Sequence, residues 1–167
     1  MPATYEPIAT ATGTGSSGVI TFTSIPSTYT DLVLVANGTT SANSGWGLQF
    51  NSDTTATYST TYVEVSGTAA SSERTSATAT ICRIAWNSLW NSTVPSTNIV
   101  SIQNYTNTTT YKTVLFKNNS STYVEAGVGL WRATPAAINR IDVTTATAGA
   151  ANFTTAATFT LYGIKAA

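Results

Sequence analysis

The sequence predicts an all-β protein, an antiparallel β-sandwich of jelly-roll type with roughly eight to ten strands. Threonine makes up about one residue in five, and together with valine, isoleucine and the aromatic residues it suits a pleated, half-buried surface. Short apolar stretches follow one another at close intervals, with turn residues between them. Almost no stretch has the character of a helix.

The first element is an N-terminal arm or edge segment, residues 1–17, in which Tyr5–Ala9 is able to form an edge strand. The rest, residues 18–167, shows no composition shift or fixed-period repeat, so we expect one sandwich domain there. Its strands are expected, in chain order, at Gly18–Ile25, Asp31–Asn37, Trp46–Asn51, Tyr58–Val65, Thr75–Trp86, Thr97–Tyr105, Tyr111–Asn118, Thr122–Ala133, Ala137–Thr144 and Ala157–Lys165.

The alternation of apolar residues predicts which strand faces are buried. Val124, Ala126, Val128 and Leu130 recur at every second position, so we expect them on the core side of their strand. The run Leu32–Val35 is apolar at every position, which is typical of a central strand covered on both sides. A neighbouring subunit is one structure that could cover the second face of this strand.

Charge and composition exclude several functions. The chain has no histidine, so it contains no Ser-His-Asp or Cys-His nucleophile system and no histidine-ligated zinc. Seven basic residues balance seven acidic ones, which gives no basic stripe for nucleic acid or for an anionic membrane surface. No run approaches the ~20 apolar residues of a membrane span. The start of the chain lacks the charged and apolar regions of a signal peptide.

The carboxylates form no diagnostic catalytic motif, and Arg140 and Asp142 are expected to pair on one strand face. Asn51–Thr54 resembles half of a calcium loop, but an Asx turn between strands explains it better. The lone Cys82 is expected to be a buried, inert thiol. We therefore expect no enzyme, no catalytic residue, no metal and no cofactor.

The segment from Trp86 to Pro95 has the asparagine, serine and proline content of a loop, yet it holds two tryptophans and a leucine. Large apolar residues on a loop mark a contact surface for sugar or protein, unless they fold back to cap the sandwich. Both alternatives stay open. The candidate interface residues are Trp86, Leu89, Trp90, Leu32, Leu34 and Tyr5.

Five segments carry a resemblance to known proteins: Met1–Thr10, Ile20–Val35, Leu48–Asp53, Val128–Arg132 and, most specifically, Phe159–Ala167. They resemble segments of small β-rich structural proteins of tailed phages, particularly cyanophages and other marine phages. The resemblance implies a component of the outer surface of the phage particle, and no catalytic residue carries over from it.

The chain shows no trimerising shaft, so within this group we expect a capsid decoration or cement protein that binds the head shell. Its partners would be the major capsid protein or other virion proteins, and it would form a homo-oligomer, preferably a trimer. The alternative is a tail fibre or receptor-binding knob that contacts host polysaccharide through tryptophan and tyrosine side chains.

Overall fold

The computed structural model describes residues 4–76, 78–146 and 151–165, except for the side chains of residues 87 and 88. Within them the chain forms twelve strands and two antiparallel sheets, and no helix capable of crossing a membrane. The prediction of an all-β antiparallel sandwich is therefore confirmed. Residues 1–3 of the expected arm lie outside the described residues.

The larger sheet has eight strands and the smaller has four. In spatial order the large sheet contains β1 (Tyr5–Thr12), β12 (Thr158–Ile164), β3 (Asp31–Gly38), β8 (Ser96–Ile102), β9 (Lys112–Asn119), β10 (Tyr123–Trp131), β5 (Tyr58–Ser66) and β6 (Ala69–Arg74). The small sheet contains β2 (Val19–Phe22), β11 (Ile141–Thr145), β4 (Ser44–Phe50) and β7 (Cys82–Trp90).

Three strands differ clearly from the expectation, and the twelve strands of the described residues exceed the predicted eight to ten. The strand expected at Ala137–Thr144 begins only at Ile141. β6 was not expected, because its six residues are all exposed and lack an alternating apolar pattern. It forms by hairpin pairing with β5 across a tight turn, in which Gly67 takes a positive φ of 59°. The strand expected at Thr75–Trp86 instead begins at Cys82 and continues to Trp90. The N-terminal segment Tyr5–Thr12 forms the edge strand β1, paired with β12.

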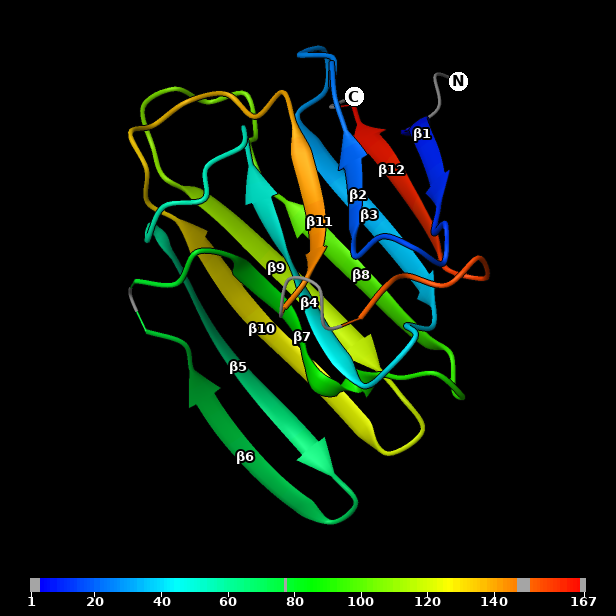
Figure 1. Cartoon of the computed structure of the whole chain (residues 1–167). Helices are drawn as coiled ribbons and strands as arrows, with labels where there is room; N and C mark the ends of the chain where they lie inside the picture. The colour runs from blue at the N-terminus through cyan, green and yellow to red at the C-terminus, as the bar shows by residue number, and fades with distance from the viewer. Residues whose placement is uncertain (1–3, 77, 147–150, 166–167) are drawn as a thin grey trace.

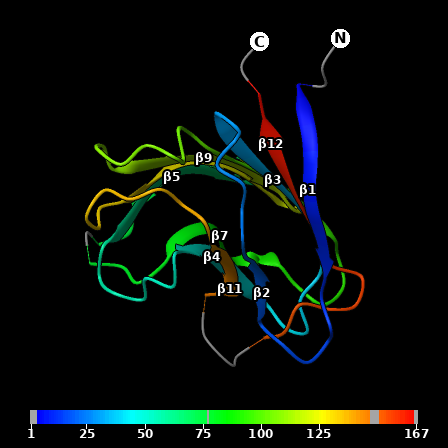
Figure 2. The ribbon, with the colours of Figure 1, turned by 90° about the horizontal axis from the view of Figure 1, so that it is seen from above.

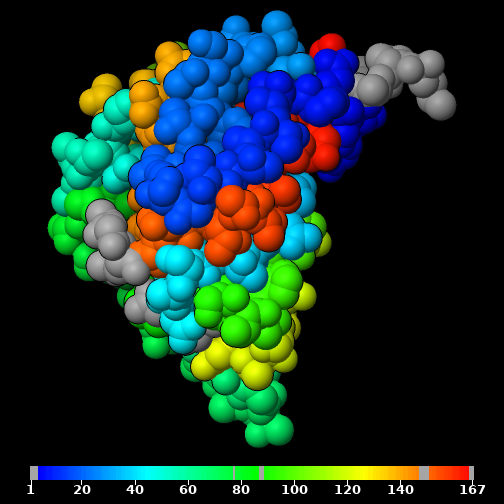
Figure 3. Space-filling view, turned by 45° about the vertical axis from the view of Figure 1, so that its right-hand side comes forward, coloured from blue at the N-terminus to red at the C-terminus, as the bar shows by residue number. Residues whose placement is uncertain are grey.

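The two sheets differ in width, and this difference shapes the molecule. Figure 2 shows the large sheet curving around the small one, which lies against a single face of it. Strands β5 and β6 extend beyond the small sheet (Figure 1), and their hairpin forms the narrow tip of the molecule in Figure 3. Among the described residues, no second layer covers the opposite face of the large sheet.

An aromatic cluster fills one end of the core. Trp90 packs edge-on against Trp46 and stacks on Phe159, with ring centroids 5.9 and 5.8 Å apart. Phe153 lies 4.8 Å from Phe159 in a T-shaped pair. Trp46, Trp90, Phe153 and Phe159 are all fully buried. The expectation that Trp86–Pro95 is a loop is therefore wrong for its first part: β7 continues to Trp90, and burial of the indole outweighs the loop-like composition.

Strand β10 turns the opposite side inward from the one that its sequence pattern predicts. Val124 and Val128 are 60% and 43% exposed. The expectation that Val124, Ala126, Val128 and Leu130 face the core is wrong, because they share the outer side of the strand and Ala126 is also exposed.

Two glycines explain this orientation of β10. An added Cβ on Gly129 would lie 2.1 Å from Cys82 Sγ, and one on Gly127 would lie 2.4 Å from Phe116 Cζ. The inner face of β10 has no room for side chains at these positions, since β7 and the neighbouring aromatic ring occupy the space. Because Gly127 and Gly129 have no side chains, the apolar pattern of the sequence does not indicate that their side of β10 faces the core.

We predict that Trp90→Ala lowers the free energy of unfolding by about 3–5 kcal/mol, because it opens a large cavity in the aromatic cluster. Chemical denaturation measures this change. Tyr111→Ala serves as the control, since Tyr111 is 57% exposed and its loss should cost little. An equal, small effect of both substitutions would contradict the core assignment of Trp90.

Candidate functional site

The outer side of the large sheet carries the largest group of exposed apolar side chains. Val63, Val65, Leu115, Val124 and Val128 are 58%, 45%, 39%, 60% and 43% exposed. Strand alternation places all of them on the face that the small sheet does not cover.

Strand register makes these residues neighbours. Val65 lies directly opposite Val124, Val63 opposite Ala126, and Val128 opposite Leu115. Side chains directly opposite one another on adjacent strands are in contact range. The outer apolar face, as we call it, is thus a continuous patch formed by Val63, Val65, Ile99, Leu115, Val124, Ala126 and Val128.

This face has little charge. Strands β8, β9 and β10 are fully described, and Lys117 is the one charged residue at their outward positions. Two hollows of about 240 and 250 Å³ lie on either side of Lys117. Val124 lines the first hollow, and Leu115 and Ala126 line the second. An apolar, shallow and weakly charged surface of this kind is typical of a protein contact site.

Four of the six predicted interface residues lie in the core. Leu32, Leu34, Leu89 and Trp90 are fully buried between the sheets. Enclosed side chains cannot contact another protein, so the prediction is wrong for these four. Leu32 and Leu34 face the small sheet, whereas Val33 and Val35 occupy the outer side of β3.

The remaining two candidates lie nearer the surface. Trp86 is partly buried, with the Arg83 guanidinium carbon 4.2 Å from its ring centroid and the Tyr62 ring 5.9 Å away. Tyr5 is 58% exposed at the sheet edge and packs edge-on against Tyr162. Neither belongs to the outer apolar face.

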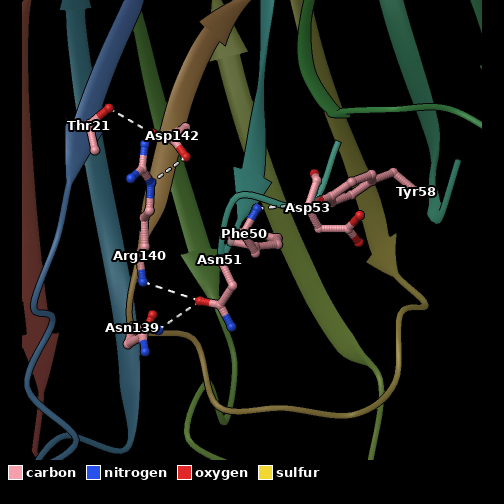
Figure 4. A network of polar contacts seen from close by, with 8 residues as sticks. All are labelled: Thr21, Phe50, Asn51, Asp53, Tyr58, Asn139, Arg140 and Asp142. Atoms are coloured by element: carbon pink, nitrogen blue, oxygen red, sulfur yellow. Dashed lines mark hydrogen bonds and ion pairs between the residues drawn. The ribbon is translucent and has the colours of Figure 1, made fainter. Parts of the chain in front are cut away.

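The turn after β4, where Figure 4 shows Asp53 beside Tyr58, uses the carboxylate of Asp53 as a structural acceptor. It accepts hydrogen bonds from Trp131 Nε1 at 2.6 Å, Thr57 Oγ1 at 2.7 Å and the Thr55 main-chain N–H at 2.9 Å. Burial by itself would raise the pKa of Asp53, but these hydrogen bonds outweigh it and lower the pKa to about 2. The bond to Thr55 N–H makes this an Asx turn, as expected.

The expected ion pair is also present, with Arg140 just before β11 and Asp142 within it (Figure 4). Arg140 donates two hydrogen bonds of 2.8 Å to Asp142, which also accepts one from Thr21 on β2. Asn51 Oδ1 accepts from the main-chain N–H of Asn139 at 3.0 Å. These contacts join neighbouring strands of the small sheet and the turn beside them, so their role is structural.

Sequence reasoning missed one pair of carboxylates. Glu125 and Glu64 lie directly opposite each other on β10 and β5, on the inner face of the large sheet. Glu125 is only 2% exposed, so an external substrate cannot reach its carboxyl group in this structure. No group of three or more residues in the described part of the chain is arranged to hold a metal ion. Cys82 is fully buried, as predicted, and burial raises the pKa of its thiol to about 12, which disfavours the reactive thiolate.

No protein-family model matches the sequence, and a search of curated proteins gives no match. Among solved structures, the chain is similar to a tetrameric galectin from Cinachyrella sp., a ball sponge. The sequences are 11% identical, the TM-score is 0.35, and the match covers 87% of this chain and 99% of the galectin.

We predict that Asp53→Ala lowers the free energy of unfolding by about 2–3 kcal/mol, because the buried Trp131 N–H loses its acceptor. Thermal unfolding with and without calcium is the measurement. The matched control is Asp31→Ala, which removes one acceptor, for the Asn104 N–H, and should cost less. A rise in the wild-type melting temperature with calcium that Asp53→Ala abolishes would contradict the Asx-turn assignment.

Proposed function

We propose that this chain is a non-catalytic structural subunit of a tailed-phage particle, which attaches to the protein surface of the particle through the outer apolar face. The main observation in support of this proposal is the continuous patch of exposed valine and leucine side chains on the uncovered side of the large sheet. The resemblance of several sequence segments to phage structural proteins supports the choice of particle.

The chemistry of the face favours a protein partner. Its side chains are aliphatic, and each valine or leucine contributes about 1.5–3 kcal/mol when it moves from water to a fully buried site. A single lysine gives little attraction for nucleic acid, which requires many phosphate contacts. Sugars are bound mainly through aromatic rings and dense hydrogen bonding, and the patch has no aromatic side chain.

The size of the face fits a subunit present in many copies. The outer apolar face spans four neighbouring strands and about five residues along them, or about 330 Å², taking ~4.8 Å per strand and ~3.4 Å per residue. Contact with a partner would then bury about 650 Å² in total, which is less than a stable one-to-one interface buries. Repeated attachment on an ordered shell compensates for modest affinity per copy, and binding the intact shell stabilises it by mass action.

This role is favoured over that of a polysaccharide-binding knob. Of the two tryptophans that a knob would use, Trp90 lies in the core. The ring of Trp86 is already in contact with Arg83 and Tyr62. Decoration or cement binding to the head shell is therefore the role that we propose within the particle, with the major capsid protein as the partner.

We predict that Val128→Lys weakens attachment to phage particles at least tenfold while leaving the melting temperature nearly unchanged. The charge would be buried without a partner at the contact, but in the free protein it remains in water. Co-sedimentation of the purified variants with stripped particles measures attachment. Val19→Lys is the matched control, because Val19 is 47% exposed on the other sheet. Equal binding by both variants would contradict docking through this face.

The role within the particle has its own test. Particles stripped of the protein should lose resistance to heat or osmotic shock and still adsorb normally to host cells. Unchanged particle stability together with lost adsorption would contradict the decoration role and favour the knob. Failure to find the protein on imaged particles would contradict both.

A further inference from the structure

A row of inward-facing polar residues crosses five strands of the large sheet. Direct register pairs Ser71 with Glu64, Glu64 with Glu125, Glu125 with Asn118, and Asn118 with Asn98. The last three are 2%, 4% and 0% exposed. Buried polar side chains in an otherwise apolar core are costly unless hydrogen bonds compensate, so this row requires an explanation.

The residues at the centre of the row, Asn118 and Glu125, bind β7 where its pairing with β4 becomes irregular. Ala85 pairs with Trp46, but the next pair along β4 joins Ser44 to Trp90, so β7 bulges between them. Asn118 Nδ2 donates to the Ile84 carbonyl at 2.6 Å, and the main-chain N–H of Trp86 donates to the Glu125 carboxyl group. Asn118 and Glu125 thus supply hydrogen bonds to β7 from the opposite sheet.

The same two side chains leave two acceptor atoms without a partner. Asn118 Nδ2 donates to Glu125 Oε2 at 3.1 Å, but Glu125 Oε1 and Asn118 Oδ1 are both buried and unpaired. Neither oxygen carries a hydrogen when Glu125 is ionised, so they cannot bond to each other. A proton on Oε1 would allow it to donate to Asn118 Oδ1. One proton then satisfies both atoms and completes a two-bond acid–amide pair.

The charged groups around Glu125 come from three neighbouring strands. Glu64 on β5 lies directly opposite and disfavours a second negative charge, while Arg83 on β7 favours it. Glu73 on β6 lies one row away, where its carboxylate accepts from the Tyr62 hydroxyl at 2.9 Å. Burial is the largest influence and, with Glu64, raises the pKa of Glu125 to about 7 despite the hydrogen bonds from Asn118 and Trp86 and the charge of Arg83.

We propose that Glu125 is a proton-dependent latch: as a neutral acid it forms a paired acid–amide contact with Asn118 and fixes the β7 bulge to the large sheet, and ionisation weakens this attachment. The latch lies inside the sandwich, away from the outer apolar face. It does not depend on the proposed function of that face.

The direction of the pH effect follows from the two pKa values. In the unfolded chain the pKa of Glu125 is near its ordinary value of 4.5, and in the folded protein it is about 7. Between these values the folded state binds the proton more tightly, so stability falls as pH rises from 4.5 to 7 and this contribution is constant above 7. The unfolding equilibrium constant should increase by up to about 300-fold across this window.

The test compares the wild type with Glu125→Gln and Glu64→Gln in denaturant unfolding at pH 5 and pH 8. Glu125→Gln keeps the shape and replaces the acid proton by an amide hydrogen, so we expect its stability to be nearly the same at both pH values. The wild type should be markedly less stable at pH 8. Glu64→Gln, the matched control, should keep a pH dependence that is shifted to lower pH, because Glu125 loses the negative charge opposite it but remains buried.

The negative charge of Glu64 determines how far the pKa of Glu125 should change in Glu64→Gln. Without the negative charge opposite, the pKa of Glu125 falls toward its ordinary value, and the window in which stability is lost ends at a lower pH than in the wild type. Glu64→Gln should therefore lose less stability than the wild type between pH 5 and pH 8, but more than Glu125→Gln, and this ordering is the result that the latch requires.

Two local measurements on the wild type complete the test. The carboxyl ¹³C shift of Glu125 should titrate near neutral pH, and hydrogen-exchange protection of residues 84–86 should fall between pH 5 and pH 8. An unchanged pH dependence in Glu125→Gln would overturn the latch. If that variant does not fold, titration of the Glu125 carboxyl group at or below pH 4.5 in the wild type would overturn it equally.

Discussion

The close approach of β7 to β10 is the constraint on which the rest of the structure depends. Cys82 and its neighbours can pack against β10 only because Gly129 has no side chain, and Gly127 leaves the same kind of space for Phe116 and Tyr62. Since a strand alternates its side chains between two faces, these glycines determine the orientation of every other residue on β10. Glu125 is thereby placed inside the sandwich, and the valines are placed outside.

Both candidate sites follow from this orientation. The small sheet covers one face of the large sheet, so valines directed to the other face remain exposed and form the outer apolar face. The inward position of Glu125 places a carboxyl group in the core beside Asn118, where it binds the main chain of β7. An apolar residue at position 125 would remove the buried acid, and it would also remove a hydrogen-bond acceptor from the β7 bulge.

Much of the fold could be predicted from the sequence, because β-branched residues, turn residues and strand spacing act locally. The sandwich, most strands, the Arg140–Asp142 pair and the buried Cys82 follow from such patterns. The candidate site could not be predicted. An alternating row of valines is normally a core signal, and it is reversed here by contacts of two glycines with residues far away in the sequence. Likewise, the asparagine and serine residues after Trp86 are typical of a loop, so the sequence did not indicate that Trp90 lies in a strand and is buried.

Thiol labelling of Val128→Cys tests the orientation of β10 most directly. The native Cys82 is fully buried, so the folded wild type should show no reactive thiol and the unfolded wild type should show one. The account predicts that one thiol per chain of the folded variant reacts rapidly with a maleimide, and that two react after denaturation. A folded variant in which neither thiol reacts until the chain unfolds would contradict it, because residue 128 would then face the core.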